Sequence, residues 1–451
     1  MSEQPTTGPI ALIVLAAGQG SRMQSDLPKV LHPLGGMPLV AHALAAGRTL
    51  EPETVIVVAG HGAEAVRRSV GKLDPEAKIA LQTEQLGTGH AVQQTIPQLE
   101  GFSGKVMVLY GDTPFIGAET LAALIKAPAD VAVLGFEAAD PGRYGRLIVE
   151  GDELQRIVEY KDATEAERAI ALCNSGVMAL DADLLRSLIA RLGNDNASGE
   201  YYLTDLVALA RAEGQRARVV ICDEAETLGI NTRAELAAAE AAFQTRARAQ
   251  ALADGVTLAD PATVWFALDT AIGRDAVVGQ NVVFGPGVTV ESGAEILPFC
   301  HLEGCHISAG ATVGPFARLR PGAELGGDVH VGNFVEIKNS VLDEGVKVGH
   351  LTYLGDAHVG ERTNIGAGTI TCNYDGVMKH RTEIGVDAFI GSDTMLVAPV
   401  RVGDRAMTGS GSTITDNVPD DALAIGRARQ VTKPGLASRL MAALRQKKRE
   451  H

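Results

Sequence analysis

The C-terminal half of the chain repeats an apolar position every six residues, from Ile272 to Ile414. A helix would need a stride near 3.6 residues, and a β-sandwich would show longer strands at wider spacing. A six-residue stride instead predicts a parallel β-helix, a prism in which each short side turns one apolar residue inward before the next corner. More than fifteen positions keep this register, which makes coincidence implausible. The ladder consists of Ile272, Val278, Phe284, Val290, Ile296, Ile307, Val313, Leu319, Leu325, Val331, Ile337, Val348, Leu354, Val359, Ile365, Ile384, Ile390, Leu396, Val402, Thr408 and Ile414.

The ladder is interrupted between Thr371 and Glu383, and we expect these 13 residues to leave the coil as a loop. A prism that is built from local stacking has few places to bind a ligand. A loop of this length could reach a neighbouring prism, so it is a candidate part of a binding site.

The first half of the chain alternates strand and helix patterns up to about Thr232. This alternation predicts a mostly parallel α/β sheet that binds its ligands at the carboxyl ends of the strands. Two further apolar runs, joined across Gly151-Asp152, predict an inserted hairpin. We expect strands at Ile10–Ala16, Thr54–Ala59, Lys78–Gln82, Val106–Tyr110 and Val131–Phe136, helices at Leu39–Leu50, Ala63–Val70, Thr88–Ile96 and Glu119–Lys126, and the hairpin at Leu147–Val149 and Leu154–Glu159.

An alanine- and glutamate-rich segment, Ala234–Ala253, separates the two patterns and contains neither Gly nor Pro. Its composition predicts one long helix that acts as a spacer. The expected organisation is therefore a domain over 1–233, a helical linker over 234–254 and a second domain over 255–451.

Residues Leu15 to Lys29 combine a strand end, a glycine turn and two cations. Gly18 and Gly20 carry no Cβ, so backbone N–H groups can approach a phosphate closely. Arg22 adds a planar guanidinium and Lys29 a point charge. The spacing fits neither a Walker loop nor the dinucleotide fingerprint. Most Gly-x-Gly pairs are ordinary turns, but together with these cations the run resembles the signature of sugar-phosphate nucleotidyltransferases.

Further polar groups stand where a nucleotide could contact them. Asp112 follows an apolar strand, a position that suits a metal-binding carboxylate beside a triphosphate and equally a helix cap. Asn231 offers a second hard oxygen from far along the chain. Gln82, with the Gly-Thr-Gly turn that begins at Gly87, could read a flat base by its edges.

The composition of the chain excludes several classes of partner and location. The formal net charge of −15 argues against nucleic acid as a partner of the whole surface. No apolar run approaches the roughly 18–20 residues of a membrane helix, and Met1–Pro9 lacks basic residues, so we expect no membrane span and no signal peptide. Five cysteines without CxxC spacing indicate free thiols in a reducing compartment, which predicts a cytoplasmic protein. The basic tail from Arg427 to Arg449 could be a solvated end or could lie near an anionic ligand.

The whole chain resembles the family of bacterial bifunctional N-acetylglucosamine-1-phosphate uridyltransferases/glucosamine-1-phosphate N-acetyltransferases. The resemblance rests on the Leu15–Lys29 and Glu84–His90 runs, the hexad prism and the highly specific run Gly349–Asp356. It implies a mixed α/β protein with a Rossmann-like nucleotidyltransferase domain, a helical linker and a left-handed parallel β-helix of hexapeptide repeats. Gln19 departs from the family, because many members carry Lys there, and it removes a cation near the triphosphate.

The resemblance also implies the site residues of the first domain. Asp112 and Asn231 would bind Mg²⁺, and Arg22 and Lys29 would neutralise the charge that develops on UTP during uridylyl transfer. The UDP-sugar would be held by Leu15, Ala16, Ala17, Gly18, Lys29, Gln82, Gly87, Thr88, Tyr110, Gly111, Asp112, Gly145, Glu159, Asn174 and Asn231.

For the prism, the resemblance implies that His350 is the catalytic base. The sugar phosphate would be held by Arg320, Lys338, Tyr353 and Asn364, and acetyl-CoA by Ala367, Asn373, Tyr374, Ser392, Ser410 and Arg427. The chemistry agrees, since a sugar amine must lose a proton before it attacks a thioester, and a His is a suitable base. Arg320 and Lys338 are 18 residues apart, so we expect them to stack on one face, as a phosphate site or as a solvated pair.

The implied function is synthesis of UDP-N-acetylglucosamine: acetylation of glucosamine 1-phosphate with acetyl-CoA, followed by UMP transfer from UTP with release of pyrophosphate. The alternatives are a monofunctional nucleotidyltransferase with a non-catalytic oligomerising β-helix, and a prism that is a pure scaffold. The Asn373-Tyr374 loop and Arg427 stand too far apart in sequence order to converge on one narrow prism, so we expect a homotrimer.

Overall fold

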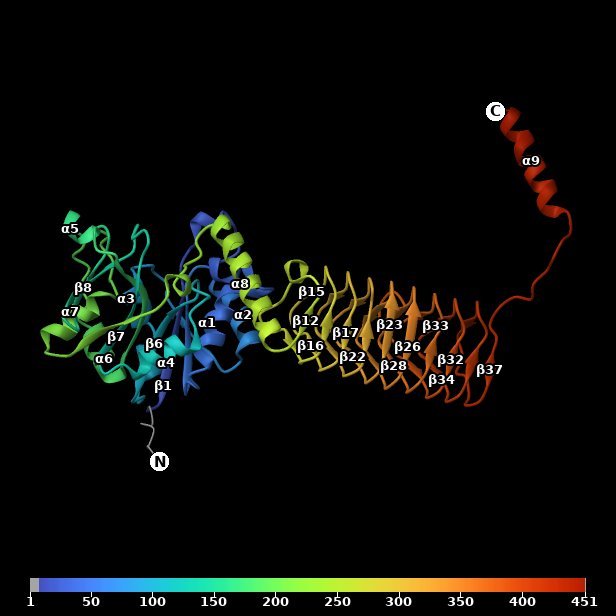
Figure 1. Cartoon of the computed structure of the whole chain (residues 1–451), viewed down its shortest axis with the longest axis horizontal. Helices are drawn as coiled ribbons and strands as arrows, with labels where there is room; N and C mark the ends of the chain where they lie inside the picture. Colours follow the sequence, from blue (N-terminus) through green and yellow to red (C-terminus); the bar gives the residue numbers. More distant parts are fainter. Residues whose placement is uncertain (1–7, 451) are drawn as a thin grey trace. The chain divides into compact units, whose positions relative to one another are not determined.

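The computed structural model describes residues 8–450 and divides into two compact units, residues 1–246 and 247–451 (Figure 1). We expect no signal peptide at Met1–Pro9, and residues 1–7 of that segment lie outside the described residues. In the described part of the chain, no helix is long and apolar enough to cross a membrane.

Unit 1 is built on one mixed sheet in the strand order β11-β7-β10-β6-β1-β4-β5, with the β8–β9 hairpin attached to β10. The pairs β1–β4, β1–β6, β4–β5 and β11–β7 are parallel, whereas β10 runs antiparallel to both of its neighbours. The strands are β1 (Ile10–Ala16), β4 (Thr54–Ala59), β5 (Lys78–Leu81), β6 (Lys105–Tyr110), β7 (Val131–Glu137), β8 (Arg146–Glu150), β9 (Glu153–Val158), β10 (Leu172–Asp181) and β11 (Ala217–Ile221).

Helices cover both faces of this sheet, because buried residues of each strand alternate between two apolar clusters. The helices are α1 (Leu39–Arg48), α2 (Ala63–Leu73), α3 (Thr88–Gln93), α4 (Ala118–Lys126), α5 (Glu165–Arg168), α6 (Ala182–Ile189), α7 (Asp205–Ala212) and α8 (Arg233–Ala253). Short 3₁₀ turns lie at η1 (Ser21–Met23), η2 (Lys29–Leu31), η3 (Ile96–Leu99) and η4 (Glu224–Glu226), and a ribbon at β2 (Pro33–Leu34) and β3 (Met37–Pro38).

The predicted strands and helices of unit 1 agree with the structure apart from their ends, but helices α5–α7 and strand β11 have no counterpart among the predictions. Strand β10 is missing from the predictions as well. Its apolar run is broken by Asn174, Ser175 and Gly176, where the register shifts in a bulge. Gly176 has a φ of 90° there, and a Cβ would lie 2.6 Å from the Tyr110 ring. Only glycine permits this close approach, which brings the start of β10 beside the carboxyl end of β6.

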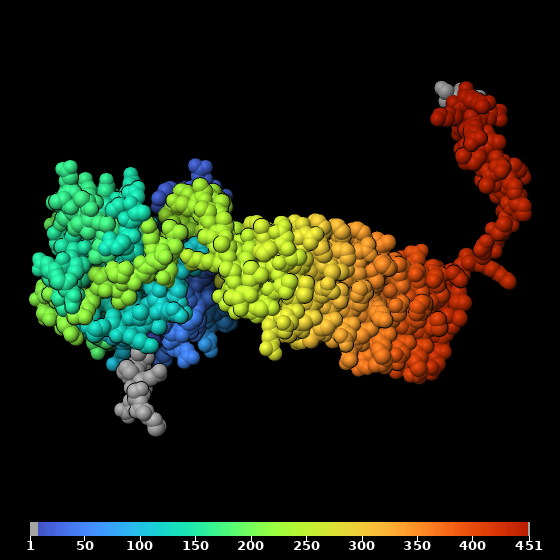
Figure 2. Space-filling view, in the orientation of Figure 1, coloured from blue at the N-terminus to red at the C-terminus, as the bar shows by residue number. Residues whose placement is uncertain are grey.

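Unit 2 is a left-handed parallel β-helix whose three sides are three parallel sheets, as the six-residue ladder predicts. In Figure 1 the strands from β12 to β37 follow one another as stacked coils, and in Figure 2 the prism presents a continuous surface of side chains. Each ladder position from Val278 to Ile414 is buried, and Ile272 in the first coil is half-buried.

The first side is the sheet of β12 (Thr257–Leu258), β14 (Val277–Val278), β17 (Glu295–Ile296), β20 (Thr312–Val313), β23 (His330–Asn333), β26 (Lys347–His350), β29 (Asn364–Ile365), β32 (Phe389–Ile390), β35 (Met407–Thr408) and β37 (Leu423–Ala424). The second side is β13 (Ala271–Ile272), β16 (Thr289–Val290), β19 (Cys305–Ile307), β22 (Ala323–Leu325), β25 (Ser340–Leu342), β28 (Ala357–Val359), β31 (Thr382–Ile384) and β34 (Val400–Val402). The third side is β15 (Val283–Phe284), β18 (His301–Leu302), β21 (Arg318–Leu319), β24 (Glu336–Lys338), β27 (Tyr353–Gly355), β30 (Ile370–Cys372), β33 (Met395–Val397) and β36 (Thr413–Ile414).

The loop expected at residues 371–383 is shorter in the structure. Thr371 is fully buried in β30, and Thr382 and Glu383 belong to β31, so the excursion spans only residues 373–381. The Thr371 hydroxyl donates to the Gly355 carbonyl at 3.0 Å and accepts from the Gly355 N–H at 2.7 Å. The coil therefore continues through a polar residue whose hydrogen bonds are satisfied internally.

Helix α8 packs against unit 1 along its first half. Leu236, Ala239 and Phe243 join an apolar cluster with Leu34 and Phe115, and the Phe243 ring contacts Gly35. Its N-terminus is a capping box, in which Glu235 accepts from the Thr232 N–H and the Thr232 hydroxyl accepts from the Glu235 N–H. The first turns of this helix are thus part of the core of unit 1. The basic tail forms a further helix, α9 (Leu436–Glu450).

Candidate functional sites

The carboxyl ends of the parallel strands place the loop within Leu15–Lys29 beside Asp112. Leu15 of β1 is paired with Tyr110 of β6, so the segments that follow both strands emerge at the same edge of the sheet. Gly20 has a φ of 63°, and a Cβ there would lie 2.5 Å from the Lys29 Cβ. Gly20 thus lets the loop fold back onto Lys29.

Lys29 joins the predicted cations and metal ligands into one cluster. Its ammonium pairs with the Asp112 carboxylate and donates to Asn231 Oδ1 at 3.0 Å. The Arg22 guanidinium donates to the same Asn231 oxygen at 2.9 Å. Asn231 reaches this point because the Ile230 N–H donates to the Asp112 carbonyl, directly before the capped start of α8. Residues more than 200 positions apart therefore meet at one point.

The donor set of this cluster fits Mg²⁺. Asp112 and Asn231 both supply hard oxygens, and the two oxygens already converge on one cation, the Lys29 ammonium. No group of three or more His, Cys, Asp or Glu side chains in the described part of the chain could hold a metal by itself.

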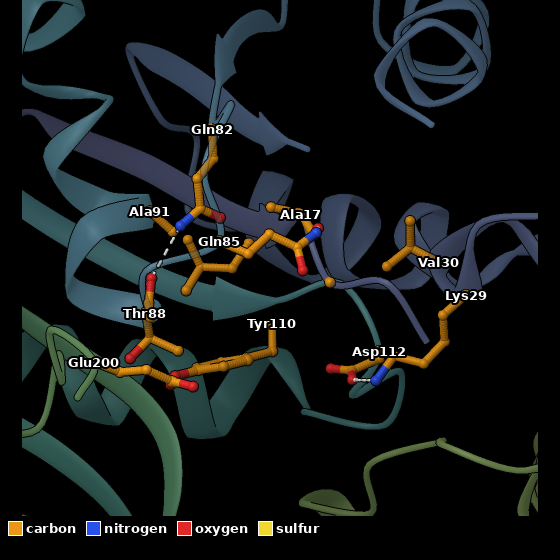
Figure 3. Close-up of a pocket in the computed structure, with 13 residues that line it drawn as sticks. Ala17, Lys29, Val30, Gln82, Gln85, Thr88, Ala91, Tyr110, Asp112 and Glu200 are labelled. Carbon is orange, nitrogen blue, oxygen red and sulfur yellow. Dashed lines mark hydrogen bonds and ion pairs between the residues drawn. The ribbon is translucent and has the colours of Figure 1, made fainter. Parts of the chain in front are cut away.

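A cavity of about 320 Å³ opens next to this cluster (Figure 3). It is lined by nine of the predicted residues: Leu15, Ala17, Gly18, Lys29, Gln82, Gly87, Thr88, Tyr110 and Asp112. The sequence reasoning missed four others, Val30, Gln85, Ala91 and Glu200. Burial, with the Glu159 and Asp112 carboxylates, raises the pKa of Tyr110, so its phenol stays protonated.

Gly145, Glu159 and Asn174 lie together but outside the cavity lining. The Asn174 N–H donates to the Gly145 carbonyl at 2.9 Å, and Gly145 faces the Glu159 carboxylate. Burial raises the pKa of Glu159, while a 3.2 Å hydrogen bond from the Thr204 hydroxyl opposes that rise. Ala16 and Gly111 do not line the cavity either. Ala16 is buried in β1, and the Gly111 N–H donates to the Leu15 carbonyl, so both residues help to hold the strand ends that border the cavity.

Arg146 holds the loop that carries Gly145. Its side chain is 1% exposed and donates to the carbonyls of Gly142 at 3.1 Å, of Tyr144, and of Arg168 at 3.1 Å. These contacts join the loop before β8 to the end of α5. No sequence pattern pointed to Arg146, because a buried arginine that donates its hydrogen bonds to backbone carbonyls leaves no spacing signature.

We expect Arg146→Met to lower the free energy of unfolding of unit 1 by about 2–3 kcal/mol, because buried carbonyls lose their donors. Urea unfolding that is followed by far-ultraviolet circular dichroism measures this change. Arg143→Met, on the exposed side of the same loop, is the matched control and should leave the midpoint unchanged. Equal stability of the two variants would show that water replaces the guanidinium.

On the prism, Arg320 and Lys338 stack as expected from their spacing. Leu319 is paired with Ile337, so the residues that follow them occupy the same position on the third side. Arg320 also donates to Glu336 Oε1 at 2.8 Å. Contact with Lys379 lowers the pKa of Lys338. Lys379, which the sequence reasoning missed, thus adds a third cation to this group.

Tyr353 and Asn373 approach the same place on the third side. Lys338 is paired with Gly355, and a Cβ at Gly355 would collide with the Tyr353 hydroxyl and lie 2.8 Å from the Asn373 Nδ2. Asn373 is anchored by a hydrogen bond to the Asp356 carboxylate. Asn364 does not join this group, because β29 belongs to the first side.

His350 lies on the first side, at the corner that leads to the third. Its Nδ1 is 2.8 Å from Asn333 Oδ1, an acceptor, so in the neutral ring the proton lies on Nδ1 and Nε2 carries the lone pair. Asn333 is the second prism residue, after Lys379, that the sequence reasoning missed. The hexad spacing contains the signal, since Asn333 and His350 are paired in β23 and β26.

The strand register aligns His350 with the expected acetyl-CoA residues. Val348 pairs with Ile365, Ile365 with Ile390, and Phe389 with Met407. The residues that lie two or three positions after these paired residues therefore occupy equivalent places on successive coils and form one column. The column consists of Asn333, His350, Ala367, Ser392 and Ser410. Arg427 donates to the Ser410 carbonyl at 2.5 Å, at the end of this column. Tyr374 lies apart in the 373–381 loop and is 61% exposed.

The comparisons with known proteins cover both units. Residues 12–253 match the family model of the MobA-like NTP transferase domain. A bifunctional protein GlmU of Paracoccus denitrificans (strain Pd 1222) is 81% identical over 98% of this chain and 99% of its own length. Proteins of the same name from Cereibacter sphaeroides (strain ATCC 17023) and Jannaschia sp. (strain CCS1) are 71% and 64% identical, over 97% and 98% of this chain and 96% and 98% of their own lengths.

Among solved structures, the inositol-1-phosphate CTP transferase of T. maritima matches 51% of this chain and 92% of its own, at 19% identity and a TM-score of 0.42.

Proposed function

The chain belongs to the family of bifunctional GlmU proteins, enzymes of UDP-N-acetylglucosamine biosynthesis with a uridyltransferase and an acetyltransferase activity, and from this premise we propose how its residues divide the work. Unit 1 carries the uridylyl transfer at the Lys29 cluster, and the prism carries the acetyl transfer at His350. The proposed domain boundaries are 1–233, a linker over 234–254, and 255–451.

In unit 1, Arg22 and Lys29 neutralise the charge that develops on the α-phosphate and on the leaving pyrophosphate of UTP. Gly18 exposes backbone N–H groups to the triphosphate, and Gln82 contacts the base. Asp112 and Asn231 would hold Mg²⁺, which would supply further positive charge next to the phosphates. Gly145, Glu159 and Asn174 bind the sugar of N-acetylglucosamine 1-phosphate, whose phosphate oxygen displaces pyrophosphate.

In the prism, Arg320, Lys338 and Tyr353 hold the phosphate of glucosamine 1-phosphate on the third side, whereas Asn364 lies outside this group on the first side. His350 Nε2 accepts a proton from the sugar amine as the amine nitrogen attacks the thioester carbonyl of acetyl-CoA. The C–S bond breaks, and the imidazole returns the proton to the departing CoA thiolate. Acetyl-CoA lies along Ala367, Ser392 and Ser410, with contacts from Asn373, Tyr374 and Arg427.

The observation that carries the acetyltransferase assignment is the shared column of His350, Ala367, Ser392 and Ser410, since a non-catalytic prism would need no free imidazole nitrogen there. The test supplies acetyl-CoA, glucosamine 1-phosphate, UTP and Mg²⁺ to the full chain and measures CoA and pyrophosphate separately. We expect both products. Pyrophosphate from N-acetylglucosamine 1-phosphate without any CoA release would support the monofunctional alternative.

We further propose that the prisms form a homotrimer in the cytoplasm. Phe299, Phe316 and Phe334 stack on successive coils with ring centroids 4.8 and 5.3 Å apart, and each ring is about half exposed. Leu351 is exposed and occupies the equivalent corner of the next coil, where its N–H donates to the Asn333 carbonyl as the Phe334 N–H donates to the Phe316 carbonyl. An exposed apolar column of this kind suits a second copy of the chain.

The five cysteines are free thiols, which agrees with a reducing compartment.

Light scattering of the full chain should give a particle of three times the 47.1 kDa chain mass. Phe316→Glu should shift the particle toward the monomer and lower acetyl transfer, because a charge then faces the partner's aromatic column. Val149→Glu, on the hairpin of unit 1, serves as the control and should keep the mass. A monomeric wild-type chain with full acetyltransferase activity would exclude the trimer.

A further inference from the structure

The amide of Gln82 is held in one orientation at the wall of the nucleotide cavity. Gln82 follows β5 and is 5% exposed, and its side chain points into the cavity in Figure 3. Its Nε2 lies 3.0 Å from the Gly87 carbonyl oxygen and 3.1 Å from His90 Nδ1. These two partners belong to the same turn at the start of α3.

The chemistry of these partners determines which amide atom faces them. A carbonyl oxygen only accepts hydrogen bonds, so the atom of Gln82 next to Gly87 must be the NH₂ group. The second N–H then points at His90 Nδ1, which accepts it when the ring proton is on Nε2. Both donors of the amide are engaged, and Oε1 remains as its hydrogen-bonding group toward the cavity.

The turn that carries both partners is itself held in place. The Gly89 N–H donates to the Tyr201 carbonyl and the Tyr201 N–H to the Leu86 carbonyl, both at 2.8 Å. Gly87 has a φ of 110°, and a Cβ there would lie 2.6 Å from the Tyr201 carbonyl oxygen. The Gly87 carbonyl and His90 therefore form a rigid acceptor pair.

A fixed acceptor distinguishes the two pyrimidine bases. Uracil presents an N3–H donor on its Watson–Crick edge, whereas cytosine presents a bare N3 lone pair at the same place. A glutamine that could turn would offer its NH₂ group to cytosine instead. We propose that His90 is a positioning residue that locks Gln82 as an acceptor and thereby makes unit 1 select uridine over cytidine nucleotides. This inference rests on the proposed uridylyl transfer in unit 1.

The test compares kcat/KM for UTP and CTP in pyrophosphate release by the full-length enzyme. His90→Leu removes the acceptor, and the preference for UTP should fall about tenfold, the effect of losing one orienting hydrogen bond. His90→Asn places a carbonyl oxygen near the former Nδ1 position and should restore most of the preference. His306→Leu on the second side of the prism is the control, and should leave the preference unchanged.

An unchanged preference in His90→Leu, or an equal fall in His90→Asn, would overturn the role of His90 while the uridyltransferase function stands. A wild-type enzyme that releases no pyrophosphate from UTP would overturn both. Nitrogen-15 NMR of the histidine-labelled wild-type enzyme gives a second readout that needs no folded variant at position 90. It should show His90 with its proton on Nε2, and a proton on Nδ1 would contradict the inference.

Discussion

Replacing His350 with alanine is expected to lower the acetyltransferase kcat by about 10²–10⁴, the range for loss of a positioned general base. The imidazole is the group that takes the proton from the sugar amine, and its Nε2 is kept free by the bond between Nδ1 and Asn333. The KM for glucosamine 1-phosphate should change little, because Arg320 and Lys338 still hold the phosphate. Release of CoA under saturating substrates measures the effect.

Two controls show whether residue 350 acts as a base or only contributes to packing. His350 is exposed, so His350→Ala should leave the melting temperature unchanged. His306→Ala changes a histidine on the second side of the prism, where it contacts Glu291, and should keep full acetyl transfer. Uridylyl transfer should be unaffected in both variants. Nearly full acetyl transfer in His350→Ala would mean that another group accepts the proton.

Asp112→Ala should lower pyrophosphate release by about 10²–10³, the loss measured when one preorganised electrostatic group is removed from an active site. The carboxylate pairs with Lys29, whose side chain is 12% exposed, and it is one of the two proposed Mg²⁺ ligands. Without it, Lys29 keeps only Asn231 as a partner in the cluster, and its position relative to the triphosphate is no longer defined. Asp112→Asn keeps the shape and should fall between Ala and wild type.

Acetyl transfer should continue at the wild-type rate in Asp112→Ala, because the prism carries its own site. Calorimetry of UTP binding with and without Mg²⁺ gives a readout apart from turnover, and the Mg²⁺ dependence of binding should weaken. Asp183→Ala, an exposed carboxylate that pairs with Arg186 on α6, is the matched control. If both activities fell together in Asp112→Ala, the residue would be structural.

The repeating and local features of this protein are determined by its sequence alone. A six-residue stride needs no distant partner to be recognised, because each ladder residue from Val278 to Ile414 is buried against residues of a neighbouring coil. The same holds for β1 and β4, whose predicted bounds agree with the structure, since a fully buried strand is a continuous apolar run. The spacing of Arg320 and Lys338 follows from the same repeat.

The sites were decided by contacts between residues far apart in the chain. Lys29 and Asn231 meet only because α8 is capped and packed beside Asp112, and no local pattern encodes that meeting. Thr371 stays in the coil because its hydroxyl bonds to Gly355, one turn of the prism away. Tertiary structure likewise orients the Gln82 amide and the His350 ring, since hydrogen-bond direction depends on the partner atom and not on residue type. Periodicity therefore determines which segments form the core, and long-range hydrogen bonding determines which atoms face the substrates.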